Sequence, residues 1–567
     1  MAKFFITNNK DIFNGVVSKI KESPFKMGFI FEHRNLYAVS VKKLFLNNEN
    51  AWCRGTNMVI TTGTPIYKES LYNENILDEF DGDVNLFRKN IIGQYAISIK
   101  RDDVTIIFCD AIGAYSIYYY NDGVDYLVSN DIIDMAKVLG DRVKSSDINI
   151  LEEVCQNSIL CGDSLYEGIR RLRGYEKILI SEKTGFIVEK LPIQKRLLGI
   201  SYSECVKELA NRFKYKAGVI TKVLGNPDIF MTGGLDARIS LASYLSIGAK
   251  PSLHYGVGDS VITNTKKNDL EIAKIFSHRY NLPFYEEDWS TPSPIDKYWD
   301  KYIAKYGVYA KNYAASDCIM KSFESLPNNI STFGYGGELY RNLPWIENRK
   351  KKFFTAEEFV DEYYIGGTHA KQLTVGVVDY RDMLIGKIKK LCEDYGLDPN
   401  RIDNKDNMYL LTEYRSYADT YMLNMMNQMR YSNLLLLEQD CLELTNIPIA
   451  YMNYSKFMLD IIKNLYEDVL EVPIFSHCVV RQYDKDKGVL APEKLSFKRR
   501  VSKYIPDYLI AMIRKIKHNK TQGSLDPIED ACMKLINQYH FYPGFCVDPD
   551  LDLRCYIHYA ILLKALK

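Results

Sequence analysis

The stretch DIFMTGGLDARISLASYL, from Asp228 to Leu245, contains a short apolar run, a pair of glycines and then an amphipathic segment. Glycines such as Gly233 and Gly234 let a backbone turn sharply and approach a ligand. Free N–H groups at a helix start attract anions, and the Thr232 hydroxyl adds a donor. Asp236 would repel a phosphate directly, so it makes sense as a ligand for Mg²⁺. The stretch therefore predicts a strand, a pyrophosphate-binding turn and a helix, although a tight turn capped by Asp236 explains these residues equally well.

The regions on either side of this stretch differ in their pattern of apolar and polar residues. The first ~190 residues contain short β-rich runs separated by turn signals. These runs are MGFIFEH, NMVITTG, GQYAISIK, VTIIFCD, YSIYYYN and YLVSND, with ILISEKTGFIVEK as a closing hairpin. After Leu191, helical patterns alternate with the apolar runs DIFM, PSLHYG and STFGYG, which predicts a parallel sheet with helices on both faces. From Thr355 onward, helical patterns dominate.

Composition limits the functions that this chain can have. Its 567 residues suggest two or three domains, and 73 basic against 72 acidic residues give no global attraction to nucleic acid or to an anionic membrane. The 12 cysteines are scattered and form no C-x-x-C pair, which argues against a zinc site or a disulfide framework. We find no signal peptide and no bilayer-spanning stretch, so we expect a cytoplasmic protein.

The segment TGGLDAR resembles the S-G-G-x-D-S pyrophosphate loop of the N-type ATP pyrophosphatases, and in particular of the asparagine synthetase superfamily. Thr232 replaces the usual Ser and keeps its hydroxyl, whereas Ala237 replaces the last Ser and removes a donor. Arg238 offers a basic group that could partly compensate. The resemblance implies ATP and Mg²⁺ as cofactors. It also implies phosphate contacts from Thr232, Gly233, Gly234 and Arg238, and it places Asp236 in the ATP site as a ligand of the magnesium ion.

The next segments follow in the order that the superfamily would have. LHYGVGDS and NDLEIAKIFSHRYNLPF look like its second strand and helix, with Asp269 opening the helix. On this match, Tyr255 and Gly256 end a strand beside the adenine.

STFGYGGELYRN, at residues 331–342, resembles the G-E-G-x-D-E segment of asparagine synthetases and more closely the G-Y-G-x-D segment of β-lactam synthetases. The match places Gly334 and Gly336 at the nucleotide. It makes Glu338 the second magnesium ligand and Tyr335 the residue that activates the attacking amine. Read alone, the segment is a glycine-rich turn. Two acidic residues behind two strand ends nevertheless indicate one ligand site at the carboxyl edge of a parallel sheet.

Two later segments carry weaker matches. MRYSNLLLLEQDCLELTNIPIAYMNY looks like the superfamily helix that ends at a V/I-P-F/I segment, and a core helix with an ordinary stop explains it equally well. The matching residues are Arg430, Asn433, Glu443 and Pro448. APEKLSFKRR resembles the stretch that brings a catalytic lysine to the phosphates, with the two basic types exchanged at Lys498 and Arg500. We expect Lys498 to be the cation that stabilises the transition state, and a solvated basic patch is the alternative.

The N-terminal part is similar to the class II glutamine amidotransferase half of asparagine synthetases. Gly93, DAIGAYSIYYY at residues 110–120 and VSND at residues 128–131 carry the similarity. That class uses an N-terminal Cys as nucleophile and its free α-amino group as base. Met1, Ala2 and Lys3 stand at that end here, and Cys53 is internal. We therefore expect no glutamine hydrolysis, a loss also seen in β-lactam synthetases and lasso-peptide cyclases.

The resemblance implies an α/β protein of three parts. Residues 1–192 would form a degenerate, Ntn-hydrolase-like α+β sandwich, residues 200–510 a parallel-sheet ATP pyrophosphatase domain, and residues 511–567 a helical extension. The implied partners are ATP, a carboxylate and an amine, which one molecule can supply, with homo-oligomerisation left open.

The implied activity is amide formation through an acyl-adenylate, with release of AMP and pyrophosphate, on a peptide, natural-product or saccharide substrate. One alternative is an asparagine synthetase that uses ammonia. Another is a non-catalytic binding or scaffold protein, which Ala237, Glu338 and the exchanged basic pair favour slightly.

Overall fold

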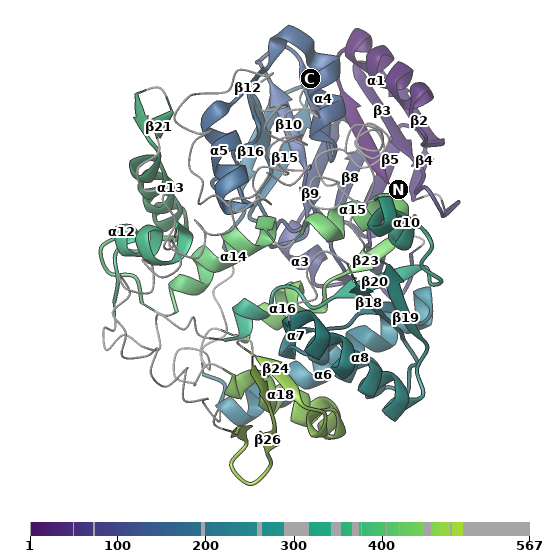
Figure 1. The fold of residues 1–567 in the computed structure, drawn as a ribbon. Helices are drawn as coiled ribbons and strands as arrows, with labels where there is room; N and C mark the ends of the chain where they lie inside the picture. The colour runs from purple at the N-terminus through teal and green to yellow at the C-terminus, as the bar shows by residue number, and fades with distance from the viewer. Residues whose placement is uncertain are drawn as a thin grey trace, which may run out of the picture.

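The chain forms a mixed α/β structure in a computed structural model (Figure 1). The structure describes residues 2–48, 50–71, 74–193, 199–257, 264–288, 317–341, 353–365, 374–375, 377–403, 405–418, 420–445, 455–476 and 479–491. Lys498, Arg500, Pro448 and the expected extension at 511–567 lie outside these residues. No helix in the described part is both long and apolar enough to cross a membrane.

Two six-stranded antiparallel sheets make up the N-terminal half. The first has the order β14-β10-β11-β1-β3-β2 and the second β16-β15-β9-β8-β5-β4. The first comprises β1 (Lys3–Thr7), β2 (Met27–His33), β3 (Leu36–Val41), β10 (Tyr118–Asn121), β11 (Tyr126–Ser129) and β14 (Ile169–Arg171). The second comprises β4 (Ala51–Arg54), β5 (Asn57–Gly63), β8 (Tyr95–Arg101), β9 (Val104–Cys109), β15 (Glu176–Ser181) and β16 (Gly185–Lys190). Side chains such as Phe4, Ile60 and Ile107 fill the space between them.

Helices cover the outer faces of both sheets. α1 (Lys10–Glu22) and α4 (Ile132–Leu139) pack on the first sheet, and α2 (Ile76–Glu79) and α3 (Val84–Arg88) on the second. Alternation along each strand explains this layering, because successive side chains point to opposite faces. The four layers agree with the α+β sandwich expected here, and the predicted runs MGFIFEH and NMVITTG form β2 and β5.

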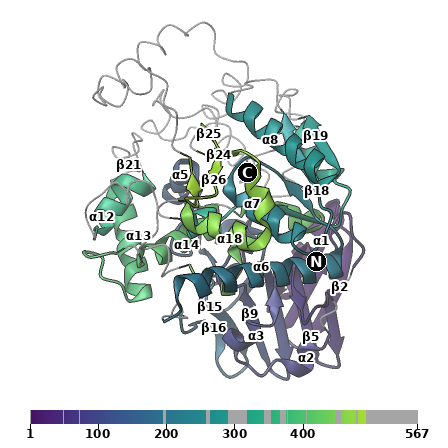
Figure 2. The same cartoon turned by 90° about the horizontal axis from the view of Figure 1, so that it is seen from below.

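A five-stranded parallel sheet follows, with the order β19-β18-β17-β20-β23. Its strands are β17 (Asp228–Phe230), β18 (Ser252–Val257), β19 (Phe284–Asp288), β20 (Ile330–Phe333) and β23 (Tyr431–Asn433). This confirms the parallel sheet expected from the runs DIFM, PSLHYG and STFGYG. The helices α6 (Tyr202–Leu224), α7 (Leu235–Leu245) and α18 (Lys456–Tyr466) pack together, as Figure 2 shows from below. α8 (Asn264–Tyr280) packs on β18, and α10 (Asp317–Glu324) on β19.

Helices dominate the described residues after Thr355, as expected. They include α12 (Ala356–Phe359), α13 (Tyr380–Tyr395), α14 (Asn407–Ala418), α15 (Tyr421–Met429) and α16 (Gln439–Leu442). The 3₁₀ turns η3 (Gly337–Tyr340), η6 (Leu435–Leu437) and η7 (Glu467–Glu471) and the π-helical turn η4 (Val360–Tyr364) are also present in this half. Small two-stranded pairs complete the fold: β6 (Ile66–Tyr67) with β7 (Ile91–Ile92), β12 (Lys144–Ser145) with β13 (Tyr166–Glu167), β21 (Thr374–Val375) with β22 (Val378–Asp379), β24 (Ile474–Ser476) with β25 (Val479–Arg481), and β26 (Tyr483–Asp484) with β27 (Val489–Leu490).

The prediction of one helix through MRYSNLLLLEQDCLEL is wrong. α15 ends at Met429, and Tyr431–Asn433 forms the edge strand β23 beside β20. Arg430 explains the change of conformation, because its guanidinium donates to the carbonyl oxygens of residues just before β20. The acceptors are those of Glu324, Leu326 and Asn328. These bonds hold the following residues alongside β20.

Buried polar contacts join the N-terminal sandwich to the parallel-sheet half. The Thr64 hydroxyl donates to the Ser432 carbonyl oxygen at 2.7 Å. The Gly93 amide donates to Oε1 of Glu438 at 2.9 Å, and Lys216 Nζ lies 3.3 Å from Oε2 of the same carboxylate. Glu438 is therefore bonded from both halves, and burial raises its pKa.

Candidate functional site

The centre of the parallel sheet contains a topological switch point. β17 is the first of its strands along the chain, and it pairs with β18 on one side and β20 on the other. The chain therefore leaves β17 and β20 toward opposite sides of the sheet, and α/β sheets bind ligands at the carboxyl ends of strands at such a point. The two glycine-rich segments, TGG and GYGG, follow these two strands.

The turn after β17 needs glycine at position 233. A Cβ atom there would lie 2.7 Å from Cδ1 of Ile272 and 2.7 Å from Cβ of Phe475. The Gly233 carbonyl oxygen accepts a hydrogen bond from the Phe475 amide at 2.9 Å, which fixes the turn. Gly234 then caps α7, and Thr232 stands exposed at the mouth of the turn. The predicted strand–turn–helix is thus present, with a packing reason for its first glycine.

Asp269 contacts this turn, a role that the sequence did not reveal. The expectation that Asp269 opens its helix is wrong, because α8 begins at Asn264. Its Oδ1 accepts a hydrogen bond of 2.6 Å from the Gly233 amide, a group that a phosphate oxygen would use in the predicted loop. Burial raises the pKa of Asp269. A phosphate can reach this amide only if the Asp269 carboxylate leaves it.

The two predicted metal ligands lie together at the switch point. Arg341 bridges them: its Nη1 lies 3.2 Å from Oδ1 of Asp236, and its Nη2 lies 3.0 Å from Oε1 of Glu338. Arg415 lies 3.7 Å from the same Glu338 oxygen. Burial alone would raise the pKa of Glu338, but the guanidinium groups of Arg415 and Arg341 outweigh it and lower that pKa.

This pair of carboxylates has the donor chemistry that Mg²⁺ prefers. In nucleotide sites Mg²⁺ binds to one or two carboxylates and takes its other ligands from phosphates and water. In the described part of the chain, no three or more His, Cys, Asp or Glu side chains gather as a metal site of their own. Asp236 and Glu338 therefore fit a site at which a divalent cation also contacts a nucleotide.

The GYGG segment is close-packed against the first turn. A Cβ atom on Gly334 would overlap the backbone nitrogen of Ala237, and one on Gly337 would overlap the carboxyl group of Asp236. Gly336 has φ +85°, a conformation that favours glycine. Close packing therefore explains why these positions are glycine. The Asp236 carboxylate lies directly against the backbone at Gly337.

Tyr335 and the predicted adenine neighbours lie at the same edge of the sheet. The half-buried ring of Tyr335 stacks near Phe333, with their ring centroids 6.0 Å apart. Tyr255 is buried near the carboxyl end of β18, and Gly256 beside it is partly exposed. β18 neighbours β17, so these residues lie next to the TGG turn.

Arg238 does not lie at the predicted phosphate position. It is fully buried, and its guanidinium donates to the carbonyl oxygens of Val469 at 2.7 Å, Val472 at 2.8 Å and Pro473 at 2.7 Å. Burial lowers its pKa to about 9. The prediction of a phosphate contact is corrected accordingly: Arg238 holds η7 and the residues that follow it against α7.

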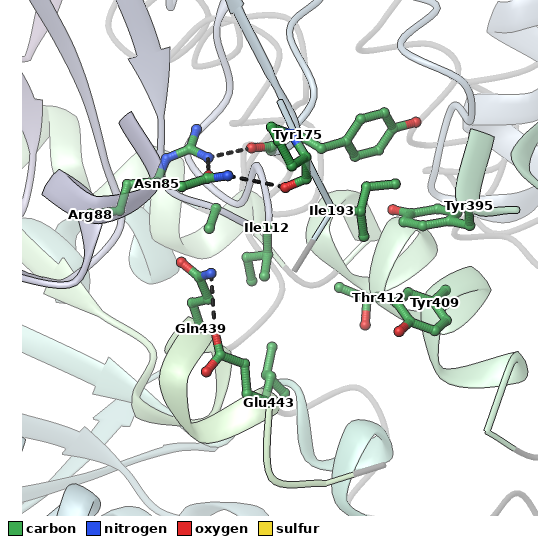
Figure 3. A pocket seen from close by; sticks show the side chains of 14 residues that line it. Asn85, Arg88, Ile112, Tyr175, Ile193, Tyr395, Tyr409, Thr412, Gln439 and Glu443 are labelled. Atoms are coloured by element: carbon green, nitrogen blue, oxygen red, sulfur yellow. Dashed lines mark hydrogen bonds between the residues drawn. The ribbon is translucent and has the colours of Figure 1, made fainter. Parts of the chain in front are cut away.

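A separate cavity lies between the two halves of the molecule. A space of about 450 Å³, lined in part by Lys216, Glu438 and Asp440, adjoins a smaller one of about 100 Å³. Figure 3 shows the smaller space, where Arg88 donates to the Gly174 carbonyl oxygen at 2.7 Å. Glu443, one of the residues that carried the match to a superfamily helix, lines both spaces. The lining includes none of the predicted ATP, metal or catalytic residues.

Known proteins show only weak similarity to this chain. No protein-family model matches the chain, and no curated protein does. Among solved structures, the glutamine phosphoribosylpyrophosphate amidotransferase from B. subtilis, complexed with ADP and GMP, aligns at 9% identity and a TM-score of 0.22. The structure described as the allosteric regulatory enzyme of purine biosynthesis aligns at 11% identity and 0.23. Each alignment covers 50% of this chain and 65% of the other. Structural similarity this weak does not identify the family of this chain. Any assignment to a family therefore rests on the residues at the carboxyl edge of the parallel sheet.

Proposed function

We propose that this protein is an ATP-dependent carbon–nitrogen ligase of the asparagine synthetase type. The observation that supports this most is the meeting of Asp236 and Glu338. They follow two different strands, yet one guanidinium contacts both, at 3.2 Å and 3.0 Å. They stand at the switch point where such sheets bind nucleotides.

In this proposal the residues of the two turns have different roles. Thr232 and the amide groups at the start of α7 bind the phosphates, and Asp236 and Glu338 hold Mg²⁺, which neutralises phosphate charge when bound. A substrate carboxylate oxygen attacks the α-phosphorus, and the bond to the leaving pyrophosphate breaks. An amine nitrogen then attacks the acyl carbon and AMP leaves. Tyr335 takes the amine proton, and Lys498 supplies a further cation to the phosphates.

Isotope exchange between pyrophosphate and ATP tests the first half-reaction. The assay uses the purified chain with Mg²⁺ and a panel of carboxylates that includes amino acids, peptides and sugar acids. We expect exchange with at least one carboxylate, and a loss of at least ~10²-fold in Asp236→Asn, as for removal of one preorganised transition-state contact. Exchange that is unchanged in that variant would remove Asp236 from the site. Aspartate with ammonia forms one arm of the panel, because an ammonia-using asparagine synthetase would respond to it.

A non-catalytic nucleotide-binding protein is the second candidate, and one observation favours it. The Asp269 carboxylate lies on the Gly233 amide, which leaves that donor engaged within the protein. Under this candidate, ATP would bind without exchange for any carboxylate. Measuring ATP binding and exchange on the same preparation separates the two.

A further inference from the structure

Arg341 lies where a metal ion would be expected. It follows η3, and its two terminal nitrogens contact a carboxylate each: Asp236 from the start of α7 and Glu338 from η3. The side chains are 17%, 17% and 25% exposed for Arg341, Asp236 and Glu338. The attraction in this partly desolvated cluster is therefore stronger than between charges on an open surface.

The guanidinium and a metal ion would compete for the same carboxylate oxygen atoms. Mg²⁺ binds carboxylate oxygens at about 2.0–2.1 Å and demands near-octahedral geometry. Arg341 now contacts Oδ1 of Asp236 and Oε1 of Glu338. A divalent cation bound between these carboxylates would repel the guanidinium. A displaced guanidinium beside a nucleotide would find phosphate oxygens, whose geometry suits its forked donors.

We propose that Arg341 is the counter-ion of the Asp236–Glu338 pair in the ligand-free protein, and that a divalent cation displaces it onto a phosphate of the nucleotide. This inference rests on the proposed function and adds to it a residue with two positions. Arg341 thereby keeps the two carboxylates together before the metal arrives and binds anionic oxygen afterwards. Arg415 remains beside Glu338 in both states.

Manganese binding without nucleotide tests the first half of this exchange. Mn²⁺ is titrated into the wild-type protein and into Arg341→Gln, with free Mn²⁺ followed by electron paramagnetic resonance. Removing the competing cation should tighten Mn²⁺ binding by ~10-fold, the effect of one charge-assisted contact. Arg341→Lys keeps the charge but lacks the fork, so it should tighten binding less.

The melting temperature and ATP affinity give two further readouts. Without metal, Arg341→Gln leaves two close carboxylates unbridged, so its melting temperature should fall, and Mn²⁺ should restore it. With Mn²⁺ saturating, ATP should bind this variant ~10-fold more weakly, because a charge-assisted phosphate contact is lost.

Arg279 provides a matched control. It also bridges two carboxylates, those of Asp468 and Glu471, with its Nε 2.9 Å from Asp468, on the exposed side of α8. Arg279→Gln should change neither Mn²⁺ nor ATP affinity.

The outcomes distinguish this inference from the proposed function. If wild type binds Mn²⁺ and ATP but Arg341→Gln binds Mn²⁺ no tighter, the displacement is wrong and the proposed function stands. The displacement is also wrong if Arg279→Gln shows the same gain as Arg341→Gln. If neither wild type nor variant binds Mn²⁺ or ATP, both are wrong.

Discussion

Tyr335 lies three residues before Glu338, in the turn that carries the proposed second metal ligand. If its phenol takes the proton of the attacking amine, Tyr335→Phe should leave pyrophosphate exchange intact. Amide formation alone should fall by ~10²–10⁴-fold, the usual contribution of a general base. Both half-reactions are measured on one preparation of the variant.

A packing role for Tyr335 predicts a different pattern. Its ring stacks near Phe333, so a purely structural contribution would slow both half-reactions together. Equal losses would therefore remove Tyr335 from the catalytic residues. Tyr285→Phe serves as control, because Tyr285 is an exposed tyrosine on β19 and should change neither step.

Single residues also show how much of the candidate site could be predicted from the sequence. Asp236 and Glu338 could be paired from the sequence, since each follows a glycine-rich strand end of one parallel sheet. Arg238 was misplaced, because adjacency to the turn says nothing of the carbonyl groups that bind its side chain. Asp269 and Arg341 were not identified as members, because their contacts depend on how separate loops pack.

Among the structural elements, the two glycine-rich turns pack so closely that no additional side-chain atom fits between them. A Cβ on Gly337 would overlap the Asp236 carboxyl group, so Gly337→Ala should push that carboxylate aside. We expect magnesium-dependent ATP affinity to fall by at least ~10-fold, because a displacement of about 1 Å can cost more than that in an organised site. Calorimetric titration of ATP with Mg²⁺ measures it.

Gly218→Ala is the matched control for that substitution. Gly218 lies within α6, and a Cβ there meets no heavy atom within 4 Å. The same chemical change should raise the free energy of unfolding by about 0.5–1 kcal/mol and leave ATP affinity unchanged. A loss of affinity in both variants would contradict the role given to Gly337.

Elements with a clear pattern were predictable, and those set by tertiary contacts were not. The short β-rich runs of β2 and β5 could be predicted directly from the sequence. β1 was missed, because Lys3–Thr7 is a short run whose partners β3 and β11 lie far along the chain. β23 was predicted as helix, because its leucine-rich surroundings favour helix and only Arg430 and the neighbouring β20 impose a strand.

Over the whole molecule, Glu438 is one of the buried ionisable groups among the described residues that link the two halves. Glu438→Ala would leave Lys216 with Asp440 as its remaining partner and the Gly93 amide without its acceptor. We expect the free energy of unfolding to fall by about 3 kcal/mol, as when one member of a buried ion pair is removed. Urea denaturation measures the change.

The exposed pair of Lys19 and Glu22, 3.2 Å apart, offers a control for that substitution. Glu22→Ala should change the free energy of unfolding by no more than about 0.5 kcal/mol, as for an exposed ion pair. Similar small effects in both variants would show that Glu438 does not couple the halves.

Equilibrium ATP binding tests, without knowledge of the substrate, whether Asp236 and Glu338 form a metal-dependent ATP site. ATP is titrated calorimetrically into wild type, Asp236→Asn and the control Asp468→Asn, each with Mg²⁺ and with a chelator. We expect wild type and Asp468→Asn to bind ATP only with Mg²⁺, and Asp236→Asn to bind it at least ~10-fold more weakly, since one charged ligand is lost. ATP binding that is equal with and without Mg²⁺, or unchanged in Asp236→Asn, would mean that these carboxylates do not form such a site.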